Sequence, residues 1–181
     1  FNNNISKIED MQKFNKSEKT GIFYGSSTGN TESVARQIQL ELGMDNSDII
    51  DVASASGKEI DNYKQLIFGT STWGIGDIQD DFAGFISHLS AANLSGKLVA
   101  IFGCGDQESY SDTFVDGMGE IWGTIKDKGC LLVGRTSNIG YSYDASKAEE
   151  DGLFVGLVID EDNQSKLTDE RIKKWVADII I

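Results

Sequence analysis

The chain of 181 residues contains no proline, one histidine and two cysteines. With a single histidine and no Cys-x-x-Cys pair, the sequence lacks the usual ligand set of a zinc site. Cys104 and Cys130 are therefore expected to be free thiols in a reducing compartment. Because proline is absent, turns must be formed by glycine, asparagine and serine.

Long apolar runs and basic residues are also scarce. No apolar run approaches the roughly 18 residues that span a bilayer, and no segment resembles a secretory signal. Lys and Arg number 16 against 29 Asp and Glu, which gives a formal net charge of −13. We therefore expect no nucleic-acid binding and no membrane insertion. An acidic surface favours basic partners, although acidity also serves solubility alone.

Residues 1–19 are polar, rich in Asn, Lys, Glu and Ser, and show no clear periodicity. We interpret them as a polar N-terminal extension that is compatible with disorder, followed by a single domain over residues 20–181. The first residue is Phe rather than Met. The extension is therefore compatible with a processed leader, a tag remnant or a natural extension.

Strand-like and helix-like segments alternate along residues 20–181. Short apolar runs predict strands near 21–24, 49–52, 66–68, 98–102 and 130–133. Helical spacing of apolar residues predicts helices near 29–42, 82–89 and 114–125, and a last helix with Thr168 as its N-cap. Residues 138–152 form an insertion, after which 153–159 resume a strand. We predict an α/β fold: a doubly wound five-stranded parallel sheet with helices on both faces and a fifth strand split by the insertion.

The segment after the first strand is Gly25-Ser26-Ser27-Thr28-Gly29-Asn30-Thr31, with four hydroxyls and two glycines but no Lys or Arg. Hydroxyls and backbone N–H groups at a helix N-terminus can cradle a phosphate. A P-loop requires Gly-Lys-Ser/Thr, and a dinucleotide fingerprint requires three spaced glycines. Neither pattern is present, so the segment predicts a phosphate site that does not hold a nucleoside triphosphate.

Two further loops carry one aromatic residue each. Trp73 lies in the Gly/Ser/Thr loop that follows the third strand, and Tyr110 lies in the loop after the fourth. Ligands of doubly wound sheets bind outside the carboxyl ends of the strands. Each loop alone is typical of an ordinary connection, but a phosphate cradle beside two aromatics suits a flat, conjugated, phosphorylated ligand.

Three motifs resemble those of the flavodoxin family, in its long-chain form, and the similarity covers residues 20–179. They are Ser26-Ser27-Thr28-Gly29-Asn30-Thr31, Thr72-Trp73-Gly74-Ile75-Gly76 and Gly103-Cys104-Gly105-Asp106-Gln107-Glu108-Ser109-Tyr110. Residues 140–147 and 154–164 resemble the long-chain insertion and the segment after it. The resemblance implies a flavodoxin-like sheet of strand order 2-1-3-4-5 and a non-covalently bound FMN. Departures are Ser71 where relatives often have Pro, Cys104 where Thr or Ser is commoner, and Thr113 where Asn is frequent.

The resemblance also implies roles for residues, none of them catalytic or metal-binding. Trp73 and Tyr110 would flank the isoalloxazine, and backbone groups of Cys104 to Asp106 would meet its pyrimidine edge. The Gly74–Ile75 peptide would flip to offer its carbonyl to the reduced N5–H, which glycine permits at little cost. The phosphate is expected on Ser26, Ser27, Thr28, Gly29, Asn30 and Thr31, and the ring on Ser71, Thr72, Trp73, Gly74, Ile75, Gly76, Cys104, Gly105, Asp106 and Tyr110.

The function implied is that of a low-potential one-electron carrier, not an enzyme. Bound FMN would move between quinone, semiquinone and hydroquinone states in place of ferredoxin. Several acidic side chains near the ring would make further negative charge on the flavin unfavourable. They are Asp77, Asp80, Asp81, Asp106, Glu108 and Asp112. Expected partners are ferredoxin/flavodoxin–NADP reductase, photosystem I or other low-potential redox enzymes, which would meet an acidic surface around the flavin edge.

We further expect a monomer in the cytoplasm, or in the plastid stroma if the extension is a processed leader. The main alternative is an NAD(P)H:quinone oxidoreductase of the same fold, and a cofactor domain of a larger reductase also stays open. A signalling receiver domain needs clustered acids after the first strand. Here Tyr24-Gly25-Ser26 stands there instead, which disfavours that class.

Overall fold

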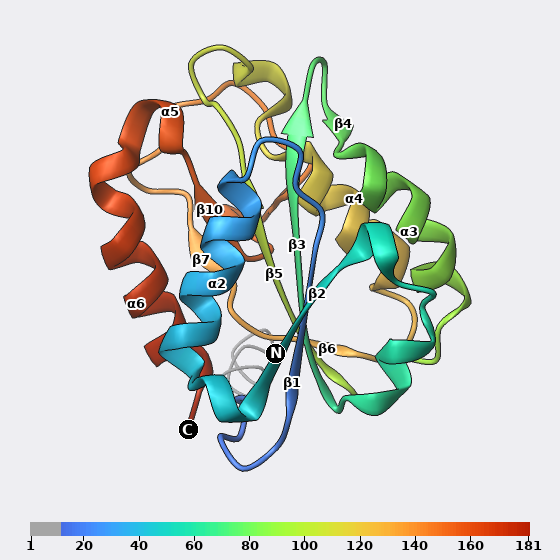
Figure 1. The fold of residues 1–181 in the computed structure, drawn as a ribbon. Helices are drawn as coiled ribbons and strands as arrows, with labels where there is room; N and C mark the ends of the chain where they lie inside the picture. The colour runs from blue at the N-terminus through green and yellow to red at the C-terminus, as the bar shows by residue number, and fades with distance from the viewer. Residues whose placement is uncertain (1–11) are drawn as a thin grey trace, which may run out of the picture.

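In the computed structural model, which describes residues 12–181, a parallel sheet lies between two layers of helices (Figure 1). Its strands follow the order β2 (Ser47–Asp51), β1 (Thr20–Tyr24), β3 (Gln65–Trp73) and β5 (Leu98–Cys104). Two short strands share the fifth position: β6 (Leu131–Leu132) pairs with the start of β5, and β10 (Leu157–Ile159) pairs with its end. The predicted strand order and the split fifth strand are confirmed.

Between β6 and β10 the chain leaves the main sheet and forms a small antiparallel sheet. Its order is β7 (Thr136–Ser137), β9 (Leu153–Phe154) and β8 (Glu149–Glu150). Phe154 packs edge-on against Tyr141 at 5.3 Å and against Phe114 at 6.2 Å between ring centroids. These contacts hold the insertion against the segment that leads into α4 (Asp116–Ile125).

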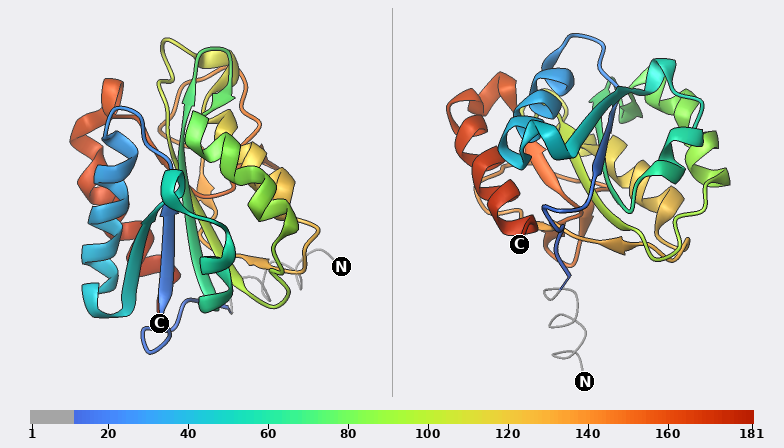
Figure 2. Two further views of the ribbon diagram at one scale, coloured as in Figure 1. Left: turned by 45° about the vertical axis from the view of Figure 1, so that its right-hand side comes forward. Right: turned by 60° about the horizontal axis from the view of Figure 1, so that its bottom comes forward.

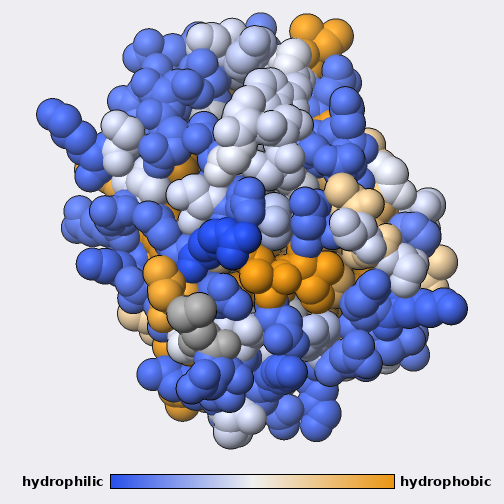
Figure 3. Space-filling view, in the orientation of Figure 1, coloured by the Kyte–Doolittle hydropathy of each residue, from blue (hydrophilic) through white to orange (hydrophobic). Residues whose placement is uncertain are grey.

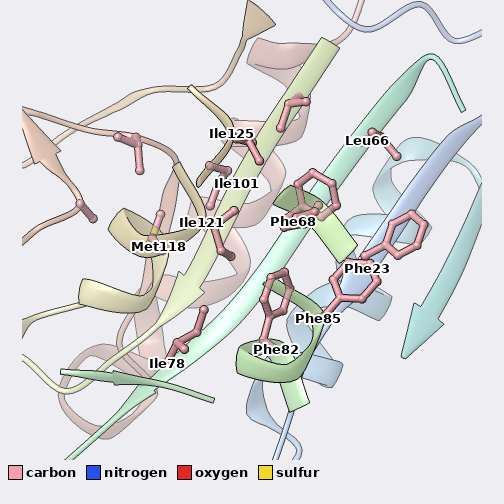
Figure 4. Close-up of a cluster of buried hydrophobic side chains, with 14 of the residues drawn as sticks. Phe23, Leu66, Phe68, Ile78, Phe82, Phe85, Ile101, Met118, Ile121 and Ile125 are labelled. Carbon is pink, nitrogen blue, oxygen red and sulfur yellow. The ribbon is translucent and has the colours of Figure 1, made fainter. Parts of the chain in front are cut away.

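Strand residues alternate between two cores because successive side chains point to opposite faces of the sheet. Phe23 contributes to the core under α3 (Asp80–Ala91) and α4, whereas Ile22 and Tyr24 face α2 (Asn30–Leu42) and α6 (Thr168–Ile179). Figure 2 shows the helix pairs on opposite faces of the sheet. In Figure 4, Phe82 and Phe85 of α3 lie beside Phe23 and Phe68 of the strands.

Shorter elements connect these layers. They are η1 (Met44–Asn46), η2 (Val52–Ser54), η3 (Lys58–Asn62), β4 (Asp77–Ile78), η4 (Ser111–Thr113), α5 (Glu161–Gln164) and η5 (Ser165–Leu167). Among the described residues, no helix is long and apolar enough to cross a membrane. The face drawn in Figure 3 is mainly hydrophilic and carries only small, separate hydrophobic patches.

The predicted N-cap of the last helix is wrong. Thr168 is the first residue of α6, and its hydroxyl donates to the Glu161 carboxylate instead of capping the helix. The reason is that α5, η5 and α6 follow one another without a break. The side-chain cap lies at the start of this run, where Asp160 Oδ1 accepts from Asn163 N at 3.1 Å.

The described part of the predicted extension, residues 12–19, packs against the domain. Phe14 is buried, its N–H donates to Ile179 O at 2.7 Å, and its carbonyl accepts from Ile181 N at 2.9 Å. Asn15 N donates to Gln65 Oε1 at 2.6 Å. The N-terminal segment is thus attached to the C-terminus and to β3. The rest of the predicted extension, residues 1–11, lies outside the described residues.

Candidate functional site

Three polar loops lie at one edge of the sheet because the strands before them are parallel. They follow β1, β3 and β5, whose carboxyl ends point upwards in Figure 1. Tyr24 is level with Gly69, and Ser71 is level with Cys104. All the predicted site residues lie on these loops or on the strand and helix ends that flank them.

The first loop leaves an open cradle at the start of α2. Gly29 has φ +98°, its N–H donates to Ser26 Oγ at 3.1 Å, and a Cβ at this position would meet nothing within 4 Å. No side chain of the described residues caps α2. The first amide N–H groups of the helix and the exposed Ser27, Thr28 and Asn30 therefore suit an anion.

Gln79 supports this loop from beneath, a contact that no local sequence pattern predicts. Its side chain is buried; Nε2 donates to Ser27 Oγ at 3.2 Å, and Oε1 accepts from Phe82 N at 2.9 Å. A Cβ at residue 25 would lie only 2.3 Å from Gln79 Oε1. A side chain at residue 25 would therefore have to displace the buried Gln79 amide at the start of α3.

The second loop is the tight turn between β3 and β4. Gly76 N donates to Trp73 O at 3.2 Å, and Gly74 has φ +51°. The Trp73 side chain is 41% exposed, and its Nε1 donates to Ser71 Oγ at 2.9 Å. Ser71 thus orients the indole.

The third loop presents Tyr110, which is 43% exposed. Its backbone N–H donates to Asp106 O at 3.0 Å. The Asp106 carboxylate accepts from Ser109 N at 2.9 Å, Asn163 Nδ2 at 2.8 Å and Glu108 N at 3.1 Å. Partial burial raises the pKa of this carboxyl, but these hydrogen bonds outweigh burial and lower it below its usual value.

Asp160 holds Gln107 of the third loop, and Gln107 in turn contacts the insertion; the sequence motifs did not indicate either contact. Its buried Oδ2 accepts from Gln107 N at 3.1 Å and from Gln107 Nε2 at 2.7 Å. Gln107 Oε1 in turn accepts from Ser142 N at 2.6 Å. These contacts join residues 35 and 53 positions apart, so no local sequence signal reveals them.

The first turn of α4 holds the second loop. Thr72 Oγ1 accepts from Gly117 N at 2.9 Å, and the buried Asp116 accepts from Lys147 N at 2.7 Å through Oδ1. Asp116 Oδ2 lies 2.9 Å from where a Cβ of residue 76 would be. Burial raises the pKa of the Asp116 carboxyl, although the Lys147 N–H works in the other direction.

Cys104 is buried beneath the loops, and burial raises the pKa of its thiol to about 12. The thiol is therefore protonated at neutral pH and is not a reactive thiolate. Thr31 is buried next to it. Because both side chains are buried, they offer a ligand no exposed surface.

Comparison with known proteins identifies the family to which this arrangement belongs. The family model described as flavodoxin matches residues 22–175. The chain belongs to the flavodoxin family. A flavodoxin of Haemophilus influenzae is 49% identical over 160 residues, covering 88% of this chain and 92% of that protein. A flavodoxin of Nostoc sp. is 48% identical over 163 residues, covering 90% and 96%.

A solved structure shows a similar fold. The Fusobacterium nucleatum flavodoxin, determined bound to flavin mononucleotide, superposes on this flavodoxin with a TM-score of 0.85 at 32% identity. The match covers 90% of this chain and 96% of that chain. The family model, the relatives and the fold therefore agree on the family.

Proposed function

We propose that this flavodoxin is a low-potential one-electron carrier that binds FMN non-covalently among the three loops. The observation that carries the proposal is an uncapped helix start with an open cradle at Gly29, placed at the same sheet edge as two half-exposed aromatics. FMN, when bound, supplies reversible one-electron chemistry. The residues present fit this group, and the FMN-bound relative supports the choice.

The phosphate would lie on Ser26 to Thr31. Backbone N–H groups at the start of α2 and the hydroxyls of Ser27 and Thr28 would donate to its oxygens. The loop contains no Lys or Arg. The phosphate would thus be held by dipoles and keep its negative charge.

The ring would lie between Trp73 and Tyr110, with backbone groups of Cys104 to Asp106 at its polar edge. The Trp73–Ser71 hydrogen bond holds the indole in place before any ligand arrives. The Gly74–Ile75 peptide, at the exposed tip of the turn, would provide a carbonyl for a proton on the ring.

Negative charge around the ring supports a low potential. Asp77, Asp80 and Asp81 are exposed near the second loop, and Glu108 and Asp112 are exposed near the third. The lowered pKa keeps Asp106 ionised. Together with the phosphate, these charges oppose the addition of an electron.

The same charges support basic redox partners at the flavin edge. We propose ferredoxin/flavodoxin–NADP reductase, photosystem I or other low-potential redox enzymes, encountered by a monomer in the cytoplasm. Both cysteines are free and buried, in keeping with a reducing compartment. Family membership favours this carrier role over a quinone reductase.

The test is to load the purified protein with FMN and titrate it with dithionite under argon. We expect a yellow protein that takes up two electrons in two separate steps. Failure to bind FMN would refute the site. Oxidation of NAD(P)H by a quinone without an added reductase would instead favour the enzyme.

A further inference from the structure

A second concave site lies between the C-terminal half of α6 and the segment that follows β6. It encloses about 860 Å³, and none of the predicted cofactor residues lines it. Its walls include Leu132, Val133 and Trp175, whose Nε1 donates to Gly134 O at 2.8 Å. Small-molecule sites commonly have a volume of roughly 300–1,000 Å³.

The charge of this groove is opposite to that of the whole chain. Four basic side chains line it, from Lys13, Arg135, Arg171 and Lys174, against one acidic side chain, that of Asp178. The chain as a whole has 29 acids and 16 bases. A local excess of positive charge on an acidic protein favours an anion at this position.

Arg171 provides the most specific evidence. Its guanidinium carbon lies 4.2 Å from the centroid of the Tyr141 ring, which is fixed by a hydrogen bond from Tyr141 Oη to Val158 O. Its Nη1 is shielded from solvent and has no hydrogen-bond acceptor among residues 12–181. A buried charged donor without an acceptor is unfavourable. An anionic oxygen would satisfy it, whereas an ordered water would do so without giving the groove affinity for an anion.

The rim of the groove is apolar. Ile139 is 86% exposed and Leu153 is 41% exposed, and both line it. Arg135 is paired with Glu150 at 3.2 Å, so its charge is largely compensated, and the local excess of positive charge rests on Lys13, Arg171 and Lys174. The groove is therefore lined by both cationic and exposed apolar side chains.

We propose that this groove binds an amphiphilic anion: a small molecule with a carboxylate, sulfonate or phosphate head at Arg171 and Lys174 and an apolar body against Ile139 and Leu153. The site is independent of the FMN loops, and FMN-loaded protein should bind such a ligand.

The probe is 8-anilinonaphthalene-1-sulfonate, titrated into FMN-loaded protein by calorimetry. We expect saturable binding that Arg171→Gln and Lys174→Gln each weaken about tenfold, the loss of one close charge pair. Lys173→Gln is the matched control, since Lys173 is the next exposed residue on α6 and does not line the groove. It should bind like the parent protein. N-phenyl-1-naphthylamine, which lacks the sulfonate, should not distinguish the variants.

Further measurements locate the bound ligand and identify its preferred head group. Backbone amide shifts should centre on Gly134, Ile139 and Lys174, and Arg171→Lys, which keeps the charge, should retain more affinity than Arg171→Gln. Decanoate and decyl phosphate, compared in the same titration, distinguish a carboxylate from a phosphate ligand.

The proposal is overturned if no saturable binding occurs, if Lys173→Gln weakens binding as much as Arg171→Gln, or if the shifts centre on Thr28 or Tyr110. Binding seen only in a chain that starts at residue 12 would also overturn it. That result would assign the groove to residues 1–11 of the protein itself.

Discussion

At the scale of single residues, Gly74 offers a test of the turn beneath the proposed flavin. Its φ is +51°, and an added Cβ would meet only Asp77 Oδ2 at 3.7 Å, an ordinary contact. Any effect of Gly74→Ala should therefore come from the restricted backbone conformation of alanine and not from a steric clash. Because alanine restricts the conformations that a peptide flip requires, we expect the first one-electron potential of FMN to fall. A cost of about 1 kcal/mol corresponds to roughly 40 mV.

The measurement is a spectroelectrochemical titration that resolves both potentials. Gly84→Ala is the control, since Gly84 lies on the exposed side of α3 and an added Cβ would meet nothing. That variant should keep both potentials. An unchanged first potential in Gly74→Ala would rule out a flip at this peptide.

Asp116 gives a pH-dependent prediction. Burial raises the pKa of its carboxyl, so its contribution to stability is fully present below the unfolded-state pKa of about 3.9. That contribution is lost as the pH rises through the raised folded-state pKa. Asp116→Asn keeps an oxygen for Lys147 N and has no such loss. We expect urea unfolding to show the variant more stable, relative to the parent, at neutral pH than at pH 4. A stability difference independent of pH would contradict this.

At the scale of elements, Asp160 connects β10, α5 and the third loop. Its carboxylate is buried and accepts from Gln107 and Asn163. Asp160→Ala leaves at least two buried donors unpaired, and each costs about 1–3 kcal/mol. We therefore expect a loss of at least about 2 kcal/mol in unfolding free energy and weaker FMN binding, measured by urea denaturation and by quenching of FMN fluorescence. Asp162→Ala, at an exposed position of α5, should change neither; an equal effect would show that charge alone is responsible.

The N-terminal segment is a second element that can be tested. The Phe14 side chain is buried in the core. Its backbone N–H and carbonyl form hydrogen bonds with Ile179 and Ile181. Phe14→Ala should cost about 3–5 kcal/mol, the usual loss for a large core side chain. Urea denaturation checks this, with the exposed Lys16→Ala expected to stay within about 0.5 kcal/mol of the parent. A small effect of Phe14→Ala would place the segment outside the folded unit.

Most helices and strands could be predicted because the apolar pattern that defines each one lies within its own residues. The i, i+3, i+4, i+7 spacing of Phe82 to Leu89 indicates α3, and the continuous run from Leu98 to Phe102 indicates a strand buried on both faces. The role of Phe14 was not predictable, since its partners lie at the other end of the chain. The same holds for Gln79 under the first loop, 52 residues from Ser27. The spacing of apolar residues predicts which face of an element is buried, but it does not predict which distant side chain packs against that face.

At the scale of the whole molecule, the charge of −13 should control encounters with a basic partner. The Debye length falls from about 30 Å at 0.01 M salt to below 10 Å above roughly 0.15 M. We therefore expect the second-order rate constant for reduction by a ferredoxin/flavodoxin–NADP reductase to fall as salt rises over this range. Stopped-flow absorbance of FMN provides the measurement.

Two variants of equal net charge separate a local effect from a global one. Asp77 is exposed beside the second loop, whereas Asp45 is exposed just before β2, at the opposite end of the sheet. If partners dock at the flavin edge, Asp77→Asn should slow the reaction at low salt and weaken its salt dependence, while Asp45→Asn should do neither. Equal slowing would mean that net charge steers the partner without a preferred face. Slowing by Asp45→Asn alone would move the docking surface to the opposite end of the sheet, away from the three loops.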